Sequence, residues 1–156
     1  MQDKDIEVFI AGARRYFESL GSGFSVLIEP PFIKQENRPF LELTGMIDIS
    51  GKAHGAVGFT ATHAMLASIL RSLNEDHIDQ DAATDLVGEI ANTLSGNARE
   101  EFGSDFKISV PVVLKNQEAS ARFPKEHLNY VIPVIWHGER AYLLVSVRDR
   151  ASVTKA

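Results

Sequence analysis

The sequence contains no cysteine, no long apolar run and no cluster of basic residues. Without cysteine the chain cannot form disulfides, thiolate metal sites or a cysteine nucleophile, which is compatible with a reducing compartment. No stretch approaches the roughly 18 continuous apolar residues of a membrane span, and the opening segment MQDKDIEVF lacks an apolar signal-peptide region. We therefore expect a cytoplasmic protein with no membrane partner.

The charge balance also excludes a class of partner. Lys and Arg number 16 against 21 Asp and Glu, which gives a net charge of −5. Proteins that bind nucleic acid cluster Lys and Arg along the phosphate backbone, so no nucleic-acid partner is expected. The length of 156 residues and the 44% hydrophobic content suffice for one core. We expect a single domain over residues 1–156.

Apolar residues recur at three- and four-residue spacing in three segments, which predicts three helices. Asp, Thr and Gly residues near their ends supply caps. The predicted helices cover residues 3–20, 62–73 and 81–102, and Asp79 or Asp81 begins the third.

Stretches rich in β-branched and aromatic residues, bounded by turn signals, predict the strands. Hairpin turns are expected at residues 50–52 and 138–139, and Pro111 is expected at a bulge or an edge. The strands are expected over residues 24–29, 41–49, 53–59, 107–114, 131–136 and 142–147. The sequence therefore predicts an α+β fold, a mainly antiparallel sheet with long helices packed against it.

One segment superficially matches a phosphate-binding P-loop. In GMIDISGK, residues 45–52, five residues separate the glycines where the motif requires four, and Ala53 replaces the hydroxyl that binds magnesium. A strand with a glycine at a bulge, followed by a hairpin turn, is the better interpretation.

No metal or hydrolase motif is found. The histidines are scattered without ligand spacing, and no GxSxG elbow frames a serine. Asp81, Asp85 and Glu89 follow one helix edge at four-residue steps, which could suggest a cation site. The helix dipole explains the first two more simply, because it favours negative charge in the opening turns. No metal site is predicted on this chain.

The helix over residues 81–102 has an unusual polar face. Glu89 and Asn92 are three residues apart, so an acid and an amide leave the same face about one turn apart. An apolar stripe is predicted to be buried, comprising Ala83, Leu86, Val87, Ile90, Ala91, Leu94, Ala98 and Phe102. The opposite stripe comprises Asp85, Gly88, Glu89, Asn92, Ser95, Gly96 and Arg99.

Two glycines interrupt this helix, four residues to either side of Asn92. Gly88 and Gly96 each cost about 1 kcal/mol relative to alanine. One interpretation is that they bind a partner, by letting its backbone approach Asn92 closely. The alternative is a solvated face whose glycines admit tight packing by another element of the same fold.

The run GEIANTLSGNA, residues 88–98, closely resembles the signature helix of the CheX, CheC and FliY family of chemotaxis phosphatases, which carries an acid and an asparagine as E-x-x-N. Residues 43–65 resemble the family's glycine-bearing hairpin leading into a helix, and SVPVVLKNQ resembles its following strand. A second E-x-x-N, from Glu126 to Asn129, leads into a strand and lacks a helical face. One well-placed motif indicates the CheX type, because CheC has two such helices and the helix after Thr62 has none.

The resemblance implies hydrolysis of the aspartyl phosphate on a CheY-type response-regulator receiver. Asn92 would orient the attacking water, and Glu89 would pair with the receiver's active-site lysine. The chain itself would hold no cofactor, because the magnesium ion is expected on the phosphorylated receiver. Family members of the CheX type form homodimers, and the apolar C-terminal hairpin could supply the edge for pairing between copies.

Two alternatives remain open at this point. The chain could be a non-catalytic adaptor that recognises a receiver or a flagellar-switch protein through the same helix. It could also be a structural dimer in which Gly88 and Gly96 let helices cross closely.

Overall fold

The computed structural model describes residues 3–21, 23, 25–33, 40–124 and 130–149. These residues form four helices and eight strands. The helices are α1 (Asp3–Glu18), α2 (His63–Ser72), α3 (Gln80–Phe102) and α4 (Asn116–Arg122). The strands are β1 (Val26–Ile28), β2 (Phe32–Ile33), β3 (Leu43–Gly51), β4 (Ala53–Ala61), β5 (Phe106–Ile108), β6 (Val112–Lys115), β7 (Tyr130–Trp136) and β8 (Glu139–Asp149).

All eight strands belong to one antiparallel sheet with the order β1-β7-β8-β4-β3-β5. The short β2 also pairs with β7, and β6 also pairs with β3. One edge of the sheet is therefore β1 with β2, and the other is β5 with β6. The predicted α+β class with a mainly antiparallel sheet is confirmed.

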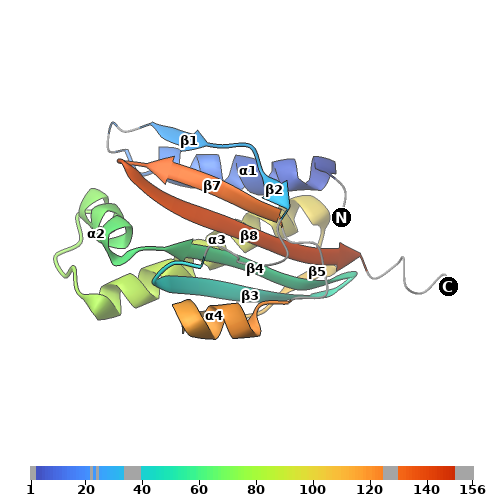
Figure 1. Ribbon diagram of the computed structural model, residues 1–156. Helices are drawn as coiled ribbons and strands as arrows, with labels where there is room; N and C mark the ends of the chain where they lie inside the picture. Colours follow the sequence, from blue (N-terminus) through green and yellow to red (C-terminus); the bar gives the residue numbers. More distant parts are fainter. Residues whose placement is uncertain (1–2, 22, 24, 34–39, 125–129, 150–156) are drawn as a thin grey trace.

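The helices cover the two faces of the sheet unequally (Figure 1). The larger core lies between the sheet and α1, α2 and α3, and the smaller core lies on the opposite face beside α4. Side chains of β3 alternate between them: Ile47 and Ile49 join the larger core, and Met46 joins the smaller one. The long α3 is thus held against the centre of the sheet.

The predicted capping residues define the helices. Thr62 caps α2 by accepting a hydrogen bond from the N–H of Met65 at 3.1 Å. Asp79 caps α3 by accepting from the N–H of Ala82 at 2.9 Å, which decides between the two candidates. Gly103 ends α3 with a φ of 102°, which a glycine adopts without strain.

The strand predicted over residues 107–114 is divided. It forms β5 and β6, separated by a segment containing Pro111, and both pair with β3 at the sheet edge. This agrees with the predicted place of Pro111, because proline cannot donate to a strand ladder.

Other details of the fold also differ from the predictions. The turn between β7 and β8 is formed by His137 and Gly138, with φ of 53° and 74°, one residue earlier than predicted. The C-terminal hairpin cannot supply a free edge, because β7 pairs with β1 and β8, and β8 pairs with β4 and β7. The short elements β2 and α4 were not predicted.

The E-x-x-N from Glu126 to Asn129 lies outside the described residues. Among the helices that the structure describes, none combines the length and the apolar character needed to cross a membrane.

Candidate functional site

Glu89 and Asn92 are both exposed on the outer face of α3. Thr93 is exposed beside them, and the half-exposed Gly96 follows one turn after Asn92. Because the two side chains are three residues apart on a regular helix, the carboxylate and the amide project together into solvent. The structure therefore places both side chains on one exposed face of α3, as their spacing in the sequence predicts.

The opposite side of α3 is buried in the larger core, as predicted. Seven of the eight predicted apolar positions are buried, and Phe102 packs against that core while partly exposed. The buried positions are Ala83, Leu86, Val87, Ile90, Ala91, Leu94 and Ala98.

Two residues assigned to the polar stripe are buried instead. Gly88 faces β6 and its approach: a Cβ added there would lie 3.3 Å from Val113 Cγ2 and 3.6 Å from Pro111 Cβ. Ser95 is fully buried, and its hydroxyl has no hydrogen-bond partner in the described structure. The error arises because α3 is covered on a flank as well as underneath, which a two-sided helical wheel does not represent.

The two helix glycines therefore have different surroundings. The space opened at Gly88 is filled by Pro111 and Val113 of the same chain, so its absent side chain is explained by tight packing within the fold. A Cβ on Gly96 would meet no atom within 4 Å. Gly96 alone retains an open surface next to Asn92, and partner contact there stays a prediction.

Beneath the site, β3 approaches α3 very closely at Gly45. A Cβ at this position would clash with the carbonyl oxygen of Val87 and lie 3.1 Å from Ala91 Cβ. The pairing of β3 with β4 runs without interruption through Gly45, so this glycine is not at the predicted bulge. It instead lets the sheet seat the helix directly below Glu89 and Asn92.

On the other flank, α1 lies antiparallel against α3. The rings of Phe9 and Phe102 are 6.1 Å apart, and a Cβ on Gly12 would lie 3.7 Å from Asn97. Further along α1, Tyr16 lies near Glu89 of α3. Burial and, second, the negative charge of Glu89 raise the pKa of Tyr16 to about 12. No local pattern in the sequence pairs Tyr16 with Glu89, because the two residues lie on different helices.

The end of α3 is also fixed. Lys52, in the turn between β3 and β4, donates a hydrogen bond from Nζ to the carbonyl of Phe102, and the Gly103 N–H donates to the carbonyl of Arg99 at 2.8 Å. A cation at this end also complements the helix dipole. With three sides packed and both ends capped, α3 is a rigid platform for its exposed pair.

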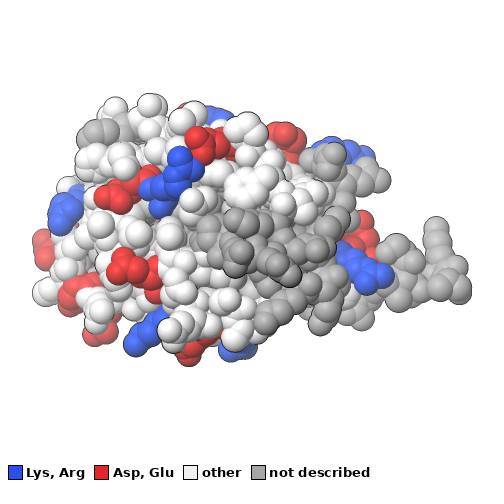
Figure 2. Space-filling model, viewed as in Figure 1, with Lys and Arg blue, Asp and Glu red and all other residues white. Residues whose placement is uncertain are grey.

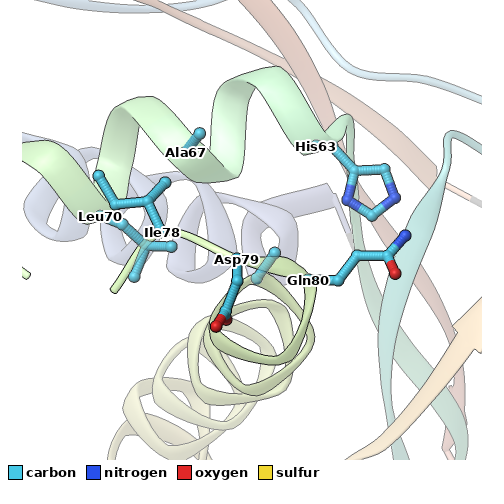
Figure 3. Close-up of a pocket in the computed structure, with 7 residues that line it drawn as sticks. His63, Ala67, Leu70, Ile78, Asp79 and Gln80 are labelled. Carbon is cyan, nitrogen blue, oxygen red and sulfur yellow. The ribbon is translucent and has the colours of Figure 1, made fainter. Parts of the chain in front are cut away.

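Two cavities in the described part of the chain lie away from the pair. A cavity of about 220 Å³ is lined by His63, Ala67 and Leu70 of α2 and by Ile78, Asp79 and Gln80 at the start of α3 (Figure 3). Ala83 of α3 also lines this cavity, and Asn92 is nine residues further along the helix, or about 14 Å at 1.5 Å per residue. A second cavity, at the β2 edge, is lined by Ile6, Glu7, Pro31, Phe32, Ile33 and Tyr130. Glu89 and Asn92 line neither of these cavities and are exposed on the surface of α3 instead.

Metal ligands do not gather in the described residues, where no group of three or more His, Asp or Glu side chains could hold an ion. Asp81 and Asp85 are exposed separately near the start of α3. On the face shown in Figure 2, acidic and basic side chains are interspersed.

The fold and the site define an α+β protein that presents an acid and an amide on a rigid, exposed helix instead of in a cavity. The family model of the chemotaxis phosphatase CheX matches residues 43–134, and the chain belongs to this family. A search of curated proteins finds no significant match.

Solved structures share the whole fold at low sequence identity. A chemotactic CheC-like protein from Shewanella oneidensis superposes with a TM-score of 0.81 at 22% identity, covering 95% of this chain and all (100%) of its own. CheX from Vibrio vulnificus gives 0.77 at 22% identity, covering 93% and 99%. A chain from the CheX–CheY–BeF₃–Mg²⁺ complex of Borrelia burgdorferi gives 0.73 at 16% identity, covering 92% and 97%.

Proposed function

We propose that this chain hydrolyses the aspartyl phosphate of a CheY-type receiver, with Asn92 orienting the attacking water and Glu89 pairing with the receiver's active-site lysine. The observation that carries the proposal is the joint exposure of Glu89 and Asn92 on one face of a helix packed on its other three sides.

The chemistry suits an amide without a strong base. An acyl phosphate is already activated, so holding a water in line with phosphorus accelerates hydrolysis by positioning. The Asn92 carboxamide can both donate and accept hydrogen bonds, which is what fixing a water requires. Glu89 supplies a negative charge one turn away, suited to pairing with an ammonium group and setting the docking register.

The proposal is compatible with the exposed position of the pair, which lines neither of the two cavities described above. A receiver supplies its own phosphorylated aspartate and its bound magnesium, so the phosphatase contributes side chains and no pocket. The Borrelia burgdorferi relative was solved together with CheY and Mg²⁺, which supports a receiver as the partner class. Homodimerisation belongs to the proposal as well, and the available sheet edges for it are β1 with β2 and β5 with β6.

The test measures phosphate loss from a CheY-type receiver phosphorylated with acetyl phosphate, with and without this protein. We expect acceleration by the natural sequence and a rate loss of about a hundredfold or more in Asn92→Ala, because positioning supplies most of the catalysis. Glu89→Ala should chiefly raise KM. Asn97→Ala is the matched control, since it makes the same change in the same helix but next to Gly12 of α1.

Three results would contradict the proposal: no acceleration over receiver autodephosphorylation, full activity in Asn92→Ala, or equal losses in the Asn92 and Asn97 variants. Receiver binding that depends on Glu89 while phosphate lifetime stays unchanged would identify an adaptor instead. Circular dichroism of each variant ensures that the comparison is made between folded proteins.

A further inference from the structure

The outer face of α3 offers a partner almost no apolar surface. Its exposed side chains near the pair are those of Asp85, Glu89, Asn92, Thr93 and Arg99. Polar contacts set orientation, but the desolvated centre of a protein interface is usually apolar. A receiver that docks on α3 must therefore find apolar contact on a neighbouring element.

One such contact borders the helix. Val110 is 79% exposed, the highest fraction for any large apolar side chain in the described residues, and Pro111 beside it is also exposed. Together they form an apolar ridge between β5 and β6. Isolated exposed apolar residues are common on protein surfaces, so exposure alone does not indicate a binding site. A binding site is indicated instead by the position of the ridge beside α3 and by the hydrogen bonds that fix its backbone.

The ridge is close to the catalytic pair. Pro111 Cβ lies 3.6 Å from where a Gly88 side chain would begin, and Gly88 is one turn, about 6 Å, from Asn92. A specific interface buries about 800 Å² on each partner, so its footprint reaches roughly 10–15 Å from the centre. A receiver centred on Asn92 would cover the ridge.

The ridge is also held in place. The N–H of Ser109 donates to the Asp48 carbonyl at 2.9 Å, and Ser109 Oγ accepts from the Asp48 N–H at 2.8 Å. Proline fixes the backbone on the other side of Val110. An apolar side chain exposed on fixed backbone loses little conformational entropy when a partner covers it.

We propose that the Val110–Pro111 ridge is the apolar part of the receiver-docking surface, contacting an apolar side chain beside the receiver's phosphorylation site. This inference rests on the proposed function. In this arrangement α3 orients the receiver and supplies the catalytic side chains, and Val110 contributes much of the affinity for the receiver. The other large exposed apolar side chains lie at the far sheet edge or around α2 and the start of α3.

The test compares Val110→Thr, which keeps the side-chain shape, and Val110→Glu with Leu27→Glu. Leu27 is 57% exposed on β1, five strand positions from β5, or about 24 Å. With the acetyl-phosphate-phosphorylated receiver, we expect KM to rise several-fold in Val110→Thr and about tenfold or more in Val110→Glu. The value of kcat at saturating receiver should stay within about twofold in each, and Leu27→Glu should change neither.

The Val110→Thr effect should persist at high salt, because apolar burial is not screened, whereas a Glu89→Ala effect should shrink. An unchanged KM in both Val110 variants, or an equal change in Leu27→Glu, would overturn the inference. So would a change in sedimentation without a change in KM, which would assign the ridge to contact between copies. Full activity in Asn92→Ala would defeat the proposed function instead, and receiver-binding affinity would then report on Val110 alone.

Discussion

Tyr16 of α1 and Glu89 of α3 lie within electrostatic reach of each other where the two antiparallel helices cross. The half-buried phenol is harder to ionise mainly because burial disfavours phenolate, and the nearby carboxylate adds to the effect, raising the pKa of Tyr16 to about 12 from 10.0. The charge of the exposed Glu89 on α3 therefore affects the ionisation of Tyr16 on α1.

The raised pKa predicts loss of stability at alkaline pH. Because the folded pKa is above the unfolded one, the Tyr16 contribution is complete below pH 10.0 and is lost as pH rises through about 12. At one pKa unit per about 1.4 kcal/mol, the loss is at most about 3 kcal/mol. Urea unfolding over this range should show a shallower decline in Tyr16→Phe than in the natural sequence.

The coupling can be checked separately through Glu89. Removing its charge in Glu89→Gln should lower the pKa of Tyr16. The titration is measured by NMR of the labelled tyrosine ring. Asp85→Asn, one turn earlier on the exposed face, is the control and should leave that titration in place. If Glu89→Gln does not move it, burial alone sets the Tyr16 pKa and the two side chains are not coupled.

Gly96 is predicted to separate stability from function. A methyl group there meets no neighbour, so Gly96→Ala should raise the free energy of unfolding by about 0.5–1 kcal/mol. If the glycine serves receiver approach, the same variant should have a higher KM for the phosphorylated receiver. A more stable variant with unchanged KM would show that Gly96 is not part of the docking surface.

Gly88 should respond differently because its side is occupied. In Gly88→Ala, the gain in helix propensity opposes a methyl contact of 3.3 Å to Val113, so the net change in stability should be small. Gly88→Leu should destabilise by about 1–3 kcal/mol through overpacking. Thermal unfolding of the two variants measures this, and a stable Gly88→Leu would mean that the Pro111 segment can move aside.

Periodicity and caps were sufficient to predict the main elements. The three long helices, the β3–β4 and β7–β8 hairpins and the exposed Glu89–Asn92 pair all follow from local spacing. Local spacing does not register what packs around α3. Gly88 and Ser95 look exposed on a helical wheel, yet β6 and the surrounding core cover them.

The short elements α4 and β2 were not predicted because they also carry little local signal. In α4 only Ala119 is buried, so its seven residues carry too little apolar periodicity to be recognised as a helix. The two residues of β2 pair with β7 immediately after Pro30 and Pro31, where a strand was predicted to stop. The Tyr16–Glu89 and Gly45–Val87 relationships join residues distant in sequence, and only the fold brings them together.

Ser95 offers a way to stabilise α3 without altering its exposed face. Its buried hydroxyl has no hydrogen-bond partner in the described structure, and burying such a group costs about 1–3 kcal/mol. Ser95→Ala removes the hydroxyl and improves helix propensity, so the free energy of unfolding should rise by about 1 kcal/mol or more. Ser146→Ala in β8, the other fully buried serine without a partner in the described residues, should act in the same direction.

Urea unfolding measures both changes in stability. Phosphatase assays should find kcat and KM unchanged in Ser95→Ala, because the side chain of Ser95 is buried in the fold while Asn92 is exposed. Loss of stability in Ser95→Ala would show that the hydroxyl is satisfied by water, and a loss of rate would mean that it helps to position the amide.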